Sequence, residues 1–140
     1  MWRTVVLLIA LLALGCGPRG LDPAGERQVR PECPGCPELR LKLRDFAFVV
    51  DGQTYKDGRP MPPLPAGKLL IVADSEARQV HTVRVTGQGR DERTPVIGVG
   101  QRGYLLVDLA AGEYEIESEG DSRARGMWAT MVTYPPGPLP

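Results

Sequence analysis

Several short segments of this chain alternate apolar and polar residues with a period of two, and this pattern constrains the fold more than any other feature. Residues 39–44, 79–86, 103–109 and 113–118 follow it. Because successive side chains of a strand point to opposite faces, each segment has one face to bury. Turn residues such as Asp51–Gly52 separate the segments, and no helical spacing of apolar residues is present. The sequence predicts an all-β sandwich of about seven strands.

The alternation also predicts which side chains face the core. Those expected inside are Leu39, Leu41, Leu43, Phe46, Phe48, His81, Val83, Val85, Leu105, Val107, Leu109, Tyr114, Ile116 and Ser118. The phase changes at Asp45, where we expect a β-bulge, and the glutamates of 113–118 should face outward. Residues 60–67, PMPPLPAG, can form neither a helix nor a central strand. Residues 67–74 and 127–134 supply further strands.

The N-terminus has the composition of an export signal. Arg3 precedes an apolar run over residues 4–14, which is shorter than the ~20 residues that span a bilayer. We therefore expect residues 1–15 to be a signal peptide. Residues 12–16, LALGC, resemble a bacterial lipoprotein signal, which implies that Cys16 carries diacylglycerol and anchors the chain outside the cytoplasm. An ordinary signal peptide followed by an incidental cysteine is the alternative.

Composition divides the rest of the chain and limits its partners. Residues 16–38 are rich in proline, glycine and charge and predict a flexible linker, residues 39–134 form the domain, and residues 135–140 form a proline-rich tail. Removing residues 1–15 takes Arg3 from the 17 basic residues, leaving 16 against 17 acidic ones. No basic patch remains, so nucleic acid is not an expected partner.

Four motifs in order resemble the cupredoxin superfamily, which includes plastocyanin, azurin and the EfeO-type cupredoxin-like domains. They are DFAF from residue 45, PAGK from 65, QVHTVRV from 79, and GEYEIES from 112 with the later Gly126–Met127. The resemblance covers most of residues 39–134 and implies a Greek-key β-sandwich. It places His81 on the first histidine ligand of a type 1 copper site and Met127 on the methionine. Ser118 falls on the cysteine position, and Ser122 or Arg123 falls on the second histidine position.

The resemblance therefore implies a copper site without its cysteine and second histidine. A type 1 centre needs a His₂Cys set with a weak axial methionine, and a serine hydroxyl does not replace a thiolate. We expect no metal cofactor, with His81 hydrogen-bonded to Ser118 and Met127 filling the core. The alternative is copper bound at a remodelled site that uses His81 and Met127.

Cys33 and Cys36 form a CxxC pair before the first strand. Pro37 follows Cys36, which excludes a c-type haem motif, and no helix follows to activate a thioredoxin-like pair. Two readings stay open: a disulfide in an oxidising compartment, or a soft-metal pair that binds Cu(I).

The sequence favours a function without catalysis. Its single histidine is already assigned to the sandwich, so no catalytic triad or Cys–His pair can be assembled. We expect a lipid-anchored accessory domain of the cell envelope that binds an unidentified envelope protein, with Trp128 and Tyr104 as exposed aromatic contacts. Copper binding or electron transfer through His81 and Met127, or through the CxxC pair, is the alternative.

Overall fold

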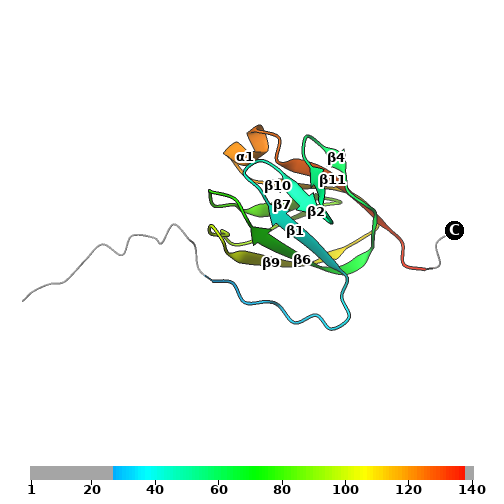
Figure 1. Ribbon diagram of the computed structural model, residues 1–140. Helices are drawn as coiled ribbons and strands as arrows, with labels where there is room; N and C mark the ends of the chain where they lie inside the picture. The colour runs from blue at the N-terminus through cyan, green and yellow to red at the C-terminus, as the bar shows by residue number, and fades with distance from the viewer. Residues whose placement is uncertain (1–26, 138–140) are drawn as a thin grey trace, which may run out of the picture.

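The computed structural model describes residues 27–137, so the predicted signal peptide and Cys16 lie outside the described residues. Two sheets stack face to face (Figure 1). The first sheet has the order β3 (Gln53–Tyr55), β2 (Phe48–Val50), β1 (Glu38–Leu43), β6 (Gly67–Ser75), β9 (Arg102–Leu109). The second has the order β4 (Arg59–Pro60), β11 (Trp128–Tyr134), β10 (Gly112–Ser118), β7 (Val83–Gly87), β8 (Arg90–Arg93), with β5 (Leu64–Pro65) also on β11. This confirms the predicted all-β sandwich.

The core lies between the inner faces of the two sheets. Leu41 and Ile71 come from the first sheet, Ile116 and Met131 from the second, and all four are fully buried. The strands are held in order mainly by antiparallel ladders, while β1 runs parallel to β6. The period-two alternation is thus the signature of strands with one buried face.

The predicted bulge at Asp45 is wrong. The chain reverses there instead, because Arg44 N–H donates to the carbonyl of Ala47 at 2.9 Å and Leu43 pairs with Phe48 across the resulting hairpin. Phe48 is buried as expected, but Phe46 sits in the turn and is only partly buried. A turn and a bulge both shift the apolar phase, and residues 44–47 alone do not distinguish them.

The proline-rich segment behaves as its composition predicts. β4 and β5 have two residues each and pair in parallel with β11 at the edge of the second sheet. Proline is tolerated there because an edge position needs no donor on its outer side.

Residues 119–127 form more than the expected loop, because one helical turn, α1 (Asp121–Ala124), lies between β10 and β11. Within residues 27–137 no helix is long and apolar enough to cross a membrane.

Candidate functional site

The residues aligned with copper ligands meet at one end of the sandwich. His81 lies just before β7 and exchanges backbone hydrogen bonds with Ile97 at 3.0 and 2.7 Å. Ser118 ends β10, and its N–H donates to the carbonyl of Met127 at 3.0 Å. His81, Ser118 and Met127 are 2 %, 0 % and 0 % exposed. The strand ends therefore bring together three of the predicted site residues in a closed interior.

His81 is paired with a hydroxyl. Its Nδ1 lies 2.7 Å from Ser118 Oγ, as the sequence analysis expected, while its Nε2 is buried without a hydrogen-bond partner among the described residues. Burial lowers the pKa of His81 below its usual value, and the Asp45 carboxylate opposes this effect without cancelling it. The imidazole is thus held neutral, in contact with a serine that offers no charge.

Ser122 and Arg123 were the two candidates for the second histidine position, and their side chains point in different directions. Ser122 points inward and is 6 % exposed. Arg123 points outward, pairs with Glu115 at 2.8 Å and Glu117 at 2.7 Å, and lies over the Trp128 ring at 4.2 Å. Ser122 is therefore the candidate that faces the interior. It supplies a second hydroxyl, beside that of Ser118, where a type 1 copper site has a histidine.

Two polar residues that the sequence analysis missed complete the site. Gln79 Nε2 donates to the carbonyl of Asp45 at 3.0 Å and to Ser122 Oγ at 3.2 Å. Asp45 in turn accepts from the backbone N–H of Arg78 at 2.8 Å, which lowers the pKa of its carboxyl. These bonds tie the hairpin turn, the segment before β7 and α1 together. The only signal in the sequence was the change of phase at Asp45.

The donor set does not suit a type 1 copper ion. The site offers one imidazole, one thioether and two hydroxyls, whereas that centre needs a thiolate and two imidazoles. Among residues 27–137 no group of three or more His, Cys, Asp or Glu side chains is arranged to hold a metal. The contacts that these side chains make in the structure are hydrogen bonds.

Cys33 and Cys36 lie far from this site. They form a disulfide within one turn, in which Pro34 and Gly35 (φ 73°) lie between them and Cys36 N–H donates to the carbonyl of Cys33 at 3.1 Å. Pro37, just before β1, accepts a hydrogen bond from Leu70 N–H through its carbonyl. His81 lies near the opposite end of β1, and a strand of this length spans about 20 Å. The structure does not bring the cysteine pair to the histidine.

The two aromatic residues expected on one recognition surface are separated. Trp128 lies on the outer face of the second sheet and packs against Gly58. Tyr104 lies on β9 of the first sheet and is also half-buried. The two rings were expected to be exposed, but both are half-buried and they lie on different sheets. Glu117 faces outward as predicted, but it is only 8 % exposed because Arg84 and Arg123 cover it.

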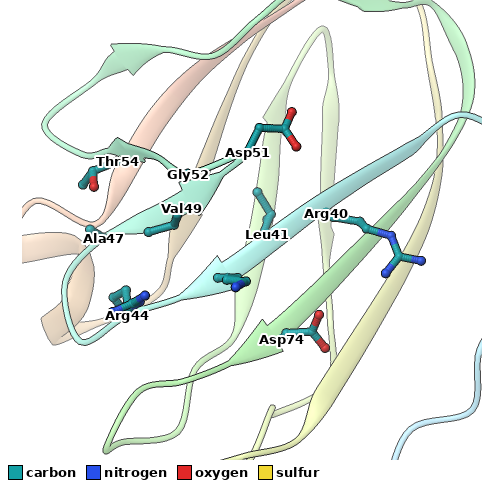
Figure 2. Close-up of a pocket in the computed structure, with 10 residues that line it drawn as sticks. Arg40, Leu41, Arg44, Ala47, Val49, Asp51, Gly52, Thr54 and Asp74 are labelled. Carbon is teal, nitrogen blue, oxygen red and sulfur yellow. The ribbon is translucent and has the colours of Figure 1, made fainter.

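A depression lies on the outer face of the first sheet (Figure 2). Arg40 and Asp74 extend from the neighbouring strands β1 and β6 at its rim (Figure 2). The basic side chains there already have carboxylate partners, since Arg44 pairs with Glu76 at 3.0 Å and Arg40 with Glu38 at 3.1 Å. Its lining contains no histidine or cysteine, and we assign it no chemistry.

Comparison with known proteins shows the fold. No protein-family model matches the sequence, and no curated protein does. Auracyanin B is similar in structure, with a TM-score of 0.58 and 14 % identity over 80 % of this chain and 97 % of that one. Reduced auracyanin from Roseiflexus castenholzii gives 0.56 and 14 % over 70 % and 97 %. A multicopper oxidase gives 0.54 and 17 % over 81 % of this chain and 48 % of its own. Residues 27–137 therefore have a cupredoxin-like fold.

Proposed function

We propose that this chain is a lipid-anchored, extracytoplasmic domain that binds a partner protein at the cell envelope, carries out no catalysis and holds no type 1 copper. One observation carries the proposal: the buried 2.7 Å contact between His81 and Ser118, the two residues that the cupredoxin resemblance places on copper-ligand positions. A neutral imidazole bonded to a hydroxyl in a closed interior is a structural pair.

The surface over this pair supports a binding role. Val80 and Val96 flank the bridge between His81 and Ile97, and Val99 follows in the same loop; they are 45 %, 48 % and 50 % exposed. Exposed aliphatic side chains gathered on two adjacent segments are typical of protein contact surfaces. We assign the envelope partner to this surface, and the anchor at Cys16 would hold it near the membrane.

Copper titration of the full chain, extracted in mild detergent, tests the metal part of the proposal. Cu(II) and reduced Cu(I) are added against a moderate competitor, and bound metal and visible absorption are followed. Wild type and His81→Ala should retain the same copper and show no thiolate-to-copper absorption. One equivalent of copper that disappears in His81→Ala would establish a remodelled site and refute the proposal.

The anchor and the partner have separate tests. Cys16→Ser should release the chain from the membrane fraction, and intact mass should show the missing lipid. A photo-crosslinking residue at Val96 should capture an envelope protein that a matched residue at exposed Thr54 does not. Equal capture at the two positions would remove the support for this surface.

A second candidate function is Cu(I) handling by Cys33 and Cys36. It is favoured by the turn, which holds the two Cα atoms 5.5 Å apart in a position to present two soft thiolates if the pair is reduced. Cu(I) bound by the reduced chain and lost in Cys33→Ser, with His81→Ala unchanged, would establish it.

A further inference from the structure

The two sheets expose four edges, and three of them are blunted. β3 has three residues, β4 and β5 have two each and end in Pro60 and Pro65, and all the residues of β8 are charged. Short, charged and proline-containing edges are the features by which natural sheets avoid pairing with other chains. The fourth edge, β9, has eight residues and no proline, and it lies at the outside of its sheet (Figure 1).

The backbone of β9 presents groups along this edge that no described strand pairs. Ser75 N–H donates to the carbonyl of Gln101 at 2.9 Å, so odd-numbered residues of β9 bond to β6. The N–H and C=O groups of Tyr104, Leu106 and Asp108 therefore point away from β6. No strand within residues 27–137 pairs with them.

One side chain caps this edge at a single point. Gln28 Oε1 accepts from Tyr104 N–H at 3.0 Å, and its Nε2 donates to the carbonyls of Pro95 and Val96 at 3.2 and 3.3 Å. Its amide thus occupies the place of a peptide group beside β9, although its segment was expected to be a free linker. Figure 1 shows this segment passing outside β9 and β6 before it enters β1.

The outward side chains of β9 are complementary to their own antiparallel copy. In order they are Arg102, Tyr104, Leu106 and Asp108, that is, basic, aromatic, aliphatic and acidic. When two such strands pair antiparallel about Leu105, Arg102 stands opposite Asp108 of the second copy and Tyr104 stands opposite Leu106. In this register the outward N–H and C=O groups of the two copies face each other and can form hydrogen bonds. Opposite-charge pairs and aromatic–aliphatic pairs are among those that stabilise adjacent strands.

We propose that β9 is the edge through which two copies of this chain associate strand to strand, with Gln28 as an internal cap that leaves Tyr104 N–H when the second copy docks. The contact is isologous, since each chain gives and receives the same side chains. The proposal is independent of whether the buried histidine pair ever held a metal.

Cysteine cross-linking of the full chain in detergent tests the register. A mixture of the Tyr104→Cys and Leu106→Cys chains should form a mixed dimer, because directly opposed residues lie about 5.5 Å apart, within disulfide range. Thr54→Cys on the opposite edge, β3, is the control and should cross-link at the background rate. Adding Gln28→Ala should raise the rate about tenfold or more, since a competing hydrogen bond is removed.

A charge exchange provides a second test that misfolding cannot imitate. Arg102→Glu and Asp108→Lys should each abolish self-association, and an equimolar mixture should restore it, because each chain then meets the opposite charge in its partner. Circular dichroism confirms that both variants fold. Cross-linking of β9 no faster than of Thr54→Cys, failure of the mixture to associate, or cross-links only to a different protein would each overturn the proposal.

Discussion

Removal of the Ser118 hydroxyl is the sharpest test of the buried histidine pair. In Ser118→Ala the Nδ1 of His81 loses its hydroxyl partner, and among the described residues both ring nitrogens are then buried without a hydrogen-bond partner. A buried polar group left unpaired costs about 1–3 kcal/mol. Because domains of this size are stable by about 5–15 kcal/mol, the loss is a large fraction of the free energy of unfolding.

Urea unfolding followed by tryptophan fluorescence measures this loss. Trp128 packs against Gly58 and reports on the fold. With a slope of about 1–3 kcal/mol per M urea, the midpoint should fall by roughly 1 M.

Ser75→Ala is the matched control. Ser75 is also a buried serine, 6 % exposed, but its Oγ has no hydrogen-bond partner within the described part of the chain. Its removal should therefore cost nothing or stabilise the protein slightly. If Ser118→Ala loses no more stability than Ser75→Ala, the hydroxyl does not satisfy His81 and the reasoning behind the proposed function is refuted.

Three further predictions concern other parts of the domain. Burial lowers the pKa of His81, so as pH falls the unfolded chain takes up a proton on this side chain at about pH 6.5, before the folded chain does. The free energy of unfolding should therefore decrease as pH drops from about 6.5 toward the folded pKa. Urea midpoints measured across this range should show the decrease in wild type and not in His81→Gln. Gly58→Ala should be less stable than Gly52→Ala. Both glycines have φ +77°, but an added Cβ meets a neighbouring side chain only at Gly58, where it would lie 2.5 Å from the Trp128 ring. Equal melting temperatures of the two variants would contradict this. Glu117→Gln should lower stability by about 1–3 kcal/mol, because Arg84 and Arg123 both pair with this nearly buried carboxylate. Glu113 makes no ion pair with any residue of 27–137, so Glu113→Gln should stay within about 0.5 kcal/mol of wild type.

The sequence predicted the parts of this molecule that depend on one strand at a time. Leu41, Val83 and Ile116 are buried because alternation alone puts them on an inner face. Asp45 was misassigned because a bulge and a hairpin shift the phase alike, and only the partner strand distinguishes them. Glu117 is polar and faces outward, but its burial depends on arginines from β7 and α1. Gln79 and Gln28 act through backbone groups of distant segments, which no local pattern indicates.

Backbone hydrogen bonds hold the loop at the end of the sandwich where His81 and Ser118 meet. Asp57 N–H donates to the carbonyl of Gly126 at 2.8 Å, and Met127 N–H donates to the carbonyl of Ser122 at 2.9 Å. Gly126 permits this approach because its φ of 96° favours glycine and an added Cβ would lie 2.2 Å from Asp57 Oδ1. The loop between β10 and β11 is thus shaped by its own turn and by its contact with residue 57. These backbone contacts keep the loop closed over His81 and Ser118. We therefore expect Ser118→Cys, which puts a cysteine at the position of the copper-site thiolate, to place a thiol beside the imidazole without opening the interior to a metal.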